Sequence, residues 1–186
     1  MASLATHGHN HWLGARIIKL LLACYMTVHA LSGWADTLEG KVVAIADGDT
    51  VTVLDAGQNQ HKIRLAGIDA PEKGQPWGQK SKESLSELVF NRAATVEWHK
   101  KDKYGRLVGK VLVDGKDANL AQVKRGLAWH YKEYQREQSP DDQERYAAAE
   151  TDAQGAKRGL WSEADPTPPW VWRKIKRDTD KHLVKP

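Results

Sequence analysis

The sequence of 186 residues has almost no cysteine and little net charge. Its single cysteine, Cys24, excludes an internal disulfide. The 28 Lys and Arg residues outnumber the 24 Asp and Glu residues by only four, and two of the basic residues lie in an N-terminal stretch, 1–35, that has no acid. So small an excess is weak evidence for a polyanionic partner. At 40% hydrophobic residues, the chain can bury the core of one domain with appendages.

Near its N-terminus, the sequence has no apolar run long enough to span a membrane. The apolar run Leu20–Val28 is too short to span a bilayer, and it follows two basic residues and precedes small residues. This layout predicts a secretory signal, 1–35, cut before Asp36, and therefore a secreted or periplasmic protein. Two alternatives remain open: an N-terminal anchor that is never cut, and lipoprotein processing at Cys24. Loss or lipidation of the cysteine suits an oxidising compartment.

The rest of the chain contains five short β-rich runs with a helical segment between the third and the fourth. Asp-Gly turns follow the first and fifth runs, and the helical segment has apolar residues at helical spacing. This order is the plan of an OB-fold, a mainly β protein of the α+β class. Pro, Trp and basic residues dominate 165–186, which we interpret as a tail. The expected strands are Lys41–Ile45, Thr50–Leu54, His61–Leu65, Thr95–His99 and Leu107–Val113, and the expected helices are Gly78–Asn91, one that Asp117 caps and one from Ser139 to about Gly155.

Charged residues gather where the third strand ends. The strand carries Arg64 on its polar face, and Asp69 and Glu72 follow it around Pro71, which cannot continue a ladder. A cation bound by the carboxylates and an anion bound by the arginine would explain these charges.

Two further clusters lie in predicted turns. Asp47-Gly48-Asp49-Thr50 joins the first two strands, and Asp102-Lys103-Tyr104-Gly105-Arg106 precedes the fifth. Each cluster alone is explained by a hairpin turn, and the Arg64 cluster alone by a surface ion pair. Together they supply acids for a hard cation, two arginines for a phosphate and a spare carboxylate that could activate water, which suffices to break a phosphodiester.

These clusters resemble the staphylococcal-nuclease-like (thermonuclease) family. The matching motifs are Ala46–Thr50, Arg64–Glu72, Asp102–Arg106 and Gly159-Leu160-Trp161, in the same order and at about the same spacing. The resemblance covers about Gly40 to Glu163, so we expect a nuclease domain at 36–164.

The resemblance implies an OB-fold five-stranded barrel with three helices and Ca²⁺-dependent cleavage of DNA and RNA that leaves 3′-phosphates. It also implies single-stranded nucleic acid as the favoured substrate and a monomer with no stable protein partner. Residue by residue, it places Asp49, Asp69 and the carbonyl of Ala70 on the Ca²⁺ ligands, Glu72 on the general base, Arg64 and Arg106 on the phosphate-binding pair, Lys103 and Tyr104 on nucleotide contacts, and Asp47 beside the metal ligands.

The sequence departs from the family pattern at several positions. Ala70 replaces a threonine whose carbonyl alone binds metal, and Lys73–Lys80 does not match a long mobile loop of the best-known member. Tyr131 and Tyr134 lie near the expected base-stacking position, but packing on the last predicted helix would explain them equally well.

The three clusters allow two alternatives to an enzyme. A non-catalytic OB-fold module that binds nucleic acid or protein would not need every acid and both arginines, which are all present. A domain that Ca²⁺ merely stabilises would use the two aspartates but neither Arg64 nor Arg106. The residues therefore favour the enzyme.

Overall fold

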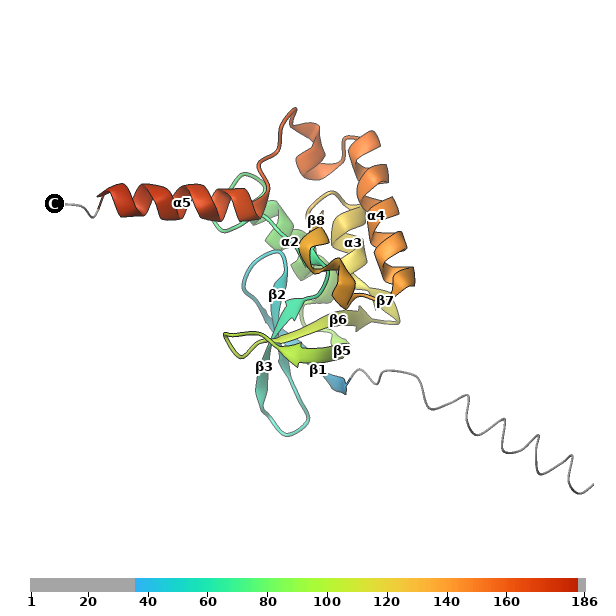
Figure 1. Cartoon of the computed structure of the whole chain (residues 1–186). Coiled ribbons are helices and arrows are strands. Elements are labelled where there is room, and N and C mark those ends of the chain that lie inside the picture. Colours follow the sequence, from blue (N-terminus) through green and yellow to red (C-terminus); the bar gives the residue numbers. More distant parts are fainter. Residues whose placement is uncertain (1–35, 184–186) are drawn as a thin grey trace, which may run out of the picture. The chain divides into compact units, whose positions relative to one another are not determined.

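The computed structural model describes residues 36–183 (Figure 1). The expected signal, 1–35, and Cys24 within it lie outside the described residues. Among the described helices, none combines the length and the apolar character that crossing a membrane requires.

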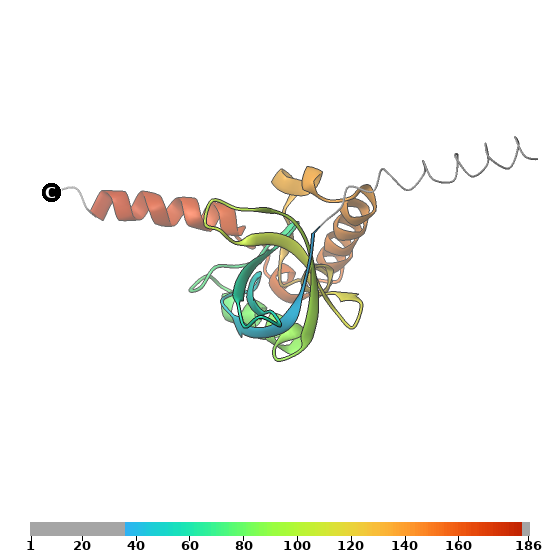
Figure 2. The same ribbon diagram turned by 90° about the horizontal axis from the view of Figure 1, so that it is seen from below.

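Strands β1, β2, β3, β5 and β6 form a closed barrel. The hydrogen-bonded order is β3-β2-β1-β5-β6-β7, and β3 also pairs with β6 in parallel, with Arg64 opposite Val108. Figure 2 shows these strands curving around the barrel. The five-stranded OB-type barrel predicted from the sequence is confirmed. The strands are β1 (Asp36–Ile45), β2 (Thr50–Leu54), β3 (Gln60–Leu65), β4 (Ile68–Asp69), β5 (Ala93–Lys101), β6 (Leu107–Val113), β7 (Lys116–Asp117) and β8 (Trp129–His130).

The barrel interior is filled by the apolar positions of the strands. Val51 and Val53 of β2 are fully buried and are separated by the half-buried Thr52, as expected for a strand with one face on the core. Gly109 of β6 allows close approach, because a Cβ there would lie 2.9 Å from a methyl carbon of Val96. Substituting Gly109 would therefore displace β5 or β6.

The described residues contain four α-helices, α2 (Gly78–Val89), α3 (Ala118–Lys124), α4 (Pro140–Gly155) and α5 (Pro169–Leu183), and two short 3₁₀ helices, η2 (Lys132–Glu137) and η3 (Gly159–Ser162). The predicted caps are confirmed: Asp117 accepts a hydrogen bond from the Leu120 amide (2.9 Å) and Ser139 from the Asp142 amide (3.2 Å). Helix α5, which forms most of the segment interpreted as a tail, was not predicted from the sequence. Beyond its first turns this helix extends away from the barrel (Figure 1).

Two buried amides fix the loops that surround one end of the barrel. The Gln122 Nε2 donates to the carbonyls of Gly48 and Ser81, each at 2.9 Å, and so joins the β1–β2 turn to α2 and α3. The Asn119 Nδ2 donates to the carbonyl of Ala66 (3.0 Å), which lies between β3 and β4. The turns that carry the predicted site residues are therefore held from inside the protein.

Candidate active site

The β1–β2 turn places Asp49 beside the end of β3. The Asp49 side chain is buried, and its Oδ1 accepts a hydrogen bond from the Thr50 hydroxyl (3.1 Å). Its Oδ2 accepts from the backbone N–H of Ala70 (2.8 Å), which follows β4. One carboxylate thus connects the first turn to the chain after the third strand.

Arg64 joins the two aspartates that the sequence analysis placed together. Its Nη1 lies 2.7 Å from Asp49 Oδ2, and its Nη2 lies 2.8 Å from Asp69 Oδ1. The Asp69 side chain is only 1% exposed, and the two-residue ladder of β4 with β8 pairs its backbone with Trp129. The structure therefore brings Asp49, Arg64 and Asp69 into one buried cluster.

Glu72 lies at the exposed border of this cluster. Its backbone N–H donates to Gln75 Oε1 (3.0 Å), and the Gln75 N–H donates back to the Glu72 carbonyl (2.9 Å). These two bonds fix the turn after Pro71, so the Glu72 carboxylate stands near Asp69 and remains more than a third exposed. A carboxylate there can reach water, as a general base must.

Arg173 of α5 enters this site, although it was not expected there from the sequence. Its Nη2 lies 2.7 Å from Asp69 Oδ2, while its Nη1 lies 3.2 Å from Asp69 Oδ1 and 2.6 Å from Glu72 Oε1. One guanidinium therefore binds both carboxylates. The available signal was Trp170, one helical turn before Arg173, because aromatic and basic residues at that spacing share a helix face.

Arg106 lies apart from this buried cluster. Its Nε is paired with Asp102 Oδ2 (2.7 Å), and Asp102 also accepts from the N–H groups of Tyr104 and Arg106, which fixes the β5–β6 turn. Within residues 36–183, Arg106 has no ion pair with Asp49, Asp69 or Glu72. The parallel register nevertheless places Val108 opposite Arg64, so Arg106 directly precedes the strand next to the site.

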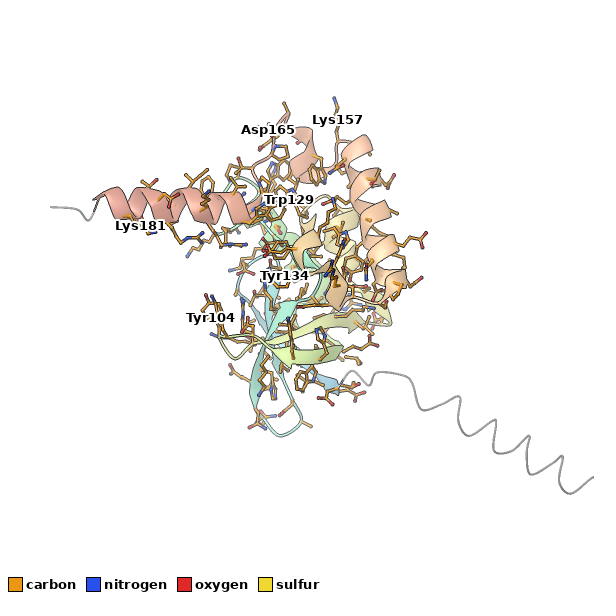
Figure 3. All side chains as sticks on the ribbon, viewed as in Figure 1. Tyr104, Trp129, Tyr134, Lys157, Asp165 and Lys181 are labelled. Atoms are coloured by element: carbon orange, nitrogen blue, oxygen red, sulfur yellow. The ribbon has the colours of Figure 1, made fainter. Side chains whose placement is uncertain are left out.

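Lys103 and Tyr104 occupy the tip of the same turn. Tyr104 is 72% exposed, and the Lys103 ammonium and the Arg106 guanidinium both lie near its ring, at 5.1 and 5.5 Å from the centroid. Figure 3 shows Tyr104 at the end of this turn, which projects from the same side of the barrel as α5. These side chains can contact a ligand that approaches the site from outside.

Aromatic residues line the other side of the site. Tyr131 stacks on Trp170 with ring centroids 5.4 Å apart, and Tyr134 packs against Tyr131 at 5.0 Å. Trp129 packs edge-on against Trp161 and Trp170, next to a cavity of about 420 Å³. Tyr131 thus packs against α5, and whether either tyrosine binds bases stays a prediction.

Burial raises the pKa of two acidic groups in the site. Burial, together with the negative charge of Asp49, raises the pKa of Asp47 to about 6. Burial also raises the pKa of Asp69, which the hydrogen bonds of Arg173 and the charge of Arg64 oppose. Concentrated, partly desolvated carboxylates of this kind favour a bound cation.

The donor atoms fit a hard cation, although the carboxylates are paired with arginines in this arrangement. Asp49 and Asp69 are close enough to share the Arg64 guanidinium, and both offer oxygen ligands. Within residues 36–183, no three acidic, histidine or cysteine side chains surround one common metal position. A cation bound here would therefore need backbone carbonyl or water ligands in addition to the two aspartates.

Comparison with known proteins gives the family. Residues 62–163 match the family described as staphylococcal nuclease homologue. The chain belongs to this family. Proteins named "uncharacterized endonuclease" are similar to it: that of Escherichia coli O157:H7 is 40% identical over 137 residues (73% of this chain and 85% of that protein), and that of Haemophilus influenzae is 39% identical over 158 residues (85% and 84%). A "micrococcal nuclease" of Shigella flexneri is 32% identical over 170 residues (87% and 94%).

This nuclease is thus a hydrolase of phosphodiester bonds with nucleic acid as its substrate. Nucleases of its family depend on a metal ion, in agreement with the oxygen donors described above. The matched range includes Arg64, Asp69, Glu72 and Arg106 but begins after the turn that carries Asp49.

Proposed function

We propose that the protein is a Ca²⁺-dependent endonuclease that hydrolyses DNA and RNA and leaves 3′-phosphates. The observation that supports this most is the buried cluster of Asp49, Arg64 and Asp69, with Glu72 at its exposed edge. Carboxylates for a cation, a guanidinium for a phosphate and a solvent-accessible base are the parts that this reaction needs.

The cation would be held by the carboxylates of Asp49 and Asp69 and the carbonyl of Ala70. Ca²⁺ suits this set because it accepts six to eight oxygen ligands in a flexible geometry, whereas Mg²⁺ demands a near-ideal octahedron. When bound, the ion offsets charge on the phosphate and makes a coordinated water more acidic.

The side chains around the cation would perform the proton transfer and the charge stabilisation. Glu72 takes a proton from the water that attacks phosphorus, the bond from phosphorus to the 5′ oxygen breaks, and solvent protonates that oxygen. The phosphate then stays on the 3′ oxygen of the other fragment. Arg64 and Arg106 donate hydrogen bonds to the phosphate oxygens as their charge increases. Lys103 and Tyr104 contact the adjoining nucleotide.

Digestion of single-stranded DNA and of RNA with Ca²⁺, with Mg²⁺ and with a chelator tests this proposal. We expect rapid cleavage with Ca²⁺, much slower cleavage with Mg²⁺ and none with chelator, and products whose masses show 3′-phosphates. Asp69→Asn should abolish the Ca²⁺ response, while Asp55→Asn, in the turn beyond the other end of β2, should leave it unchanged. Equal rates with Ca²⁺ and chelator, or 5′-phosphate products, would contradict the proposal.

We also propose that the protein is exported and acts as a monomer with a preference for single strands. The layout of residues 1–35 supports export, and the exposed turn of Tyr104 suits unstacked bases. Protein recovered from outside the cytoplasm should begin at Asp36 by intact mass, or at a lipidated Cys24. Light scattering should give the mass of one chain, and full-length protein found only in the cytoplasm would disprove export.

A further inference from the structure

We propose that Arg173 is a built-in competitor of the catalytic cation, and that α5 must release it before the nuclease can act. The inference rests on the proposed function in one respect, since it takes Asp69 as a cation ligand and Glu72 as the base. Trp170 and Arg173, which hold α5 at the site, are called the clasp below.

The contacts of Arg173 use the oxygens that the reaction requires. Asp69 Oδ2 accepts from Arg173 Nη2 at 2.7 Å, and Asp69 Oδ1 is shared between Arg173 Nη1 (3.2 Å) and Arg64 Nη2 (2.8 Å). Both oxygens of Asp69 are thus occupied by guanidinium groups. A cation that coordinates Asp69 has to take an oxygen from one of them.

Glu72 is occupied by the same guanidinium. Its Oε1 accepts from Arg173 Nη1 at 2.6 Å, which leaves Oε2 as the oxygen that can accept from water. The guanidinium therefore occupies a cation ligand and one oxygen of the proposed base at the same time.

Hydrogen bonds of the segment before α5, and the stacking of Trp170, hold the clasp at the site. The buried Gln75, which fixes Glu72, donates from Nε2 to the carbonyl of Thr167 (2.6 Å). The Trp77 indole N–H donates to Glu163 (2.8 Å), and Trp170 stacks on Tyr131. These tethers place Arg173 on the carboxylates independently of its own charge, which distinguishes the clasp from a loose basic tail.

The rest of α5 gives the clasp little further support. From Lys174 to Lys181 every residue is exposed, and the Arg173 side chain is itself 35% exposed. The partner of this guanidinium, Asp69, is buried, so its charge must stay paired when Arg173 leaves. A divalent cation that takes the place of Arg173 keeps Asp69 paired, and the exchange does not require the barrel to open.

The effect on cation binding follows from population arithmetic. When the binding-competent state is only a fraction of the molecules, the apparent dissociation constant rises by the inverse of that fraction. If the clasp is closed in about nine molecules of ten, its removal tightens cation binding about tenfold. Arg173→Lys keeps the charge but loses the paired hydrogen bonds to Asp69. Its apparent dissociation constant for the cation should therefore lie between those of the parent protein and of Arg173→Ala.

Calorimetric titration with Ca²⁺ in the absence of nucleic acid measures this effect directly. We expect Arg173→Ala to lower the apparent dissociation constant about tenfold, and Arg177→Ala, which removes an equal charge from the exposed part of the same helix, to leave it unchanged. Hydrogen exchange gives a second readout: Ca²⁺ should speed exchange at the start of α5 in the parent protein, and in Arg173→Ala exchange there should already be fast.

Activity separates the clasp from a direct role in catalysis. Arg173→Ala should lower the Ca²⁺ concentration for half-maximal cleavage while turnover at saturating Ca²⁺ stays the same. Unchanged or weaker Ca²⁺ binding in Arg173→Ala would overturn the inference and leave the proposed function standing. Loss of turnover at saturating Ca²⁺ would make Arg173 a third substrate-binding arginine and would also overturn it. Absence of Ca²⁺ binding in every variant would remove both proposals.

Discussion

Asp69 illustrates, at the scale of single residues, why the site depends on geometry as well as charge. Arg64 and Arg173 approach its carboxylate from different segments, each with two N–H groups directed at acidic oxygens. A guanidinium holds two acceptors in a fixed plane, whereas an ammonium is a single mobile point charge. Substitutions that conserve charge therefore test the geometry without leaving a buried carboxylate unpaired.

The first prediction concerns the phosphate-binding pair. Arg64→Lys and Arg106→Lys should each lower turnover by about 10³-fold, because paired donors to the phosphate matter most in the transition state. Initial rates on single-stranded DNA at saturating Ca²⁺ give the result, and a melting curve shows that each variant is folded. Near-normal turnover in a folded Arg106→Lys protein would show that Arg106 does not act on the phosphate.

Glu72→Gln should lower turnover by a similar factor, because the amide cannot accept the proton of the attacking water. Its effect should not add fully to that of Arg64→Lys, since the groups act together in one step. Rates of the two single variants and of the double variant form the test. Full additivity would indicate that the two residues act in separate steps.

A third prediction uses Tyr131 as a reporter of the clasp. Burial, with the Glu133 hydrogen bond and the charge of Asp69, raises the pKa of Tyr131 to about 12. Because this folded-state pKa exceeds the unfolded value near 10, the stability it contributes is full below about pH 10 and is lost between about pH 10 and 12. Trp170→Ala uncovers the ring and should lower the Tyr131 pKa. Titration by NMR of ring-labelled tyrosine measures this, and an unchanged value would show that Trp170 does not shield Tyr131.

At the scale of elements, the β1–β2 turn depends on close packing against α2. A Cβ on Gly48 would overlap the Ser81 hydroxyl and lie 2.8 Å from the Ala70 Cβ. The turn that carries Asp49 would then have to move away from the chain segment that carries Asp69. The glycine is thus required by its neighbours in space.

Gly48→Ala should therefore destabilise the protein by about 1–3 kcal/mol and weaken Ca²⁺ binding as well. Gly155→Ala is a suitable control, because it lies at the exposed end of α4, where the new methyl group would meet nothing within 4 Å. Denaturant unfolding and calorimetric titration measure the two effects. If Gly48→Ala were as stable as the parent, the close contact would not matter to the fold.

Elements with a clear period were predictable from sequence, and those that depend on distant partners were not. The apolar, β-rich run Leu107–Val113 and the cap at Ser139 are local signals, and β6 and α4 lie where they were predicted. The two-residue ladder of β4 and β8 has no local signal, because it forms only when the loops meet. Asp49, Arg64 and Asp69 were predictable because Asp49 lies in the turn before β2, and the other two lie near the end of β3 and shortly after it.

Arg173 could not be placed in the site from sequence because its position depends on tethers made far along the chain. The Gln75–Thr167 and Trp77–Glu163 hydrogen bonds join segments about ninety residues apart. Trp172, Ile175 and Thr179 do have helical spacing, so the helix itself was predictable from a pattern that the tail interpretation overlooked.

At the scale of the whole molecule, α5 is an addition to a core that is complete without it. None of the residues of the main hydrophobic cluster comes from beyond α4. Removal of residues 166–186 should therefore lower the melting temperature by only a few degrees, while it tightens Ca²⁺ binding in the same direction as Arg173→Ala. Differential scanning calorimetry and titration of the shortened protein provide the check. Loss of the cooperative melting transition in the shortened protein would show that α5 is part of the core structure.

The attachment of α5 by one end has a practical consequence for anyone who handles this enzyme. Fifteen residues of helix extend about 22 Å, and every residue from Lys174 to Lys181 is exposed. A fusion partner, affinity tag or solid support joined behind Leu183 would be attached to the C-terminal end of the helix whose N-terminal part carries Arg173. It could therefore disturb the contacts of Arg173 with Asp69 and Glu72. Two laboratories that tag opposite ends of the same chain would then measure different calcium requirements, and both measurements would be correct.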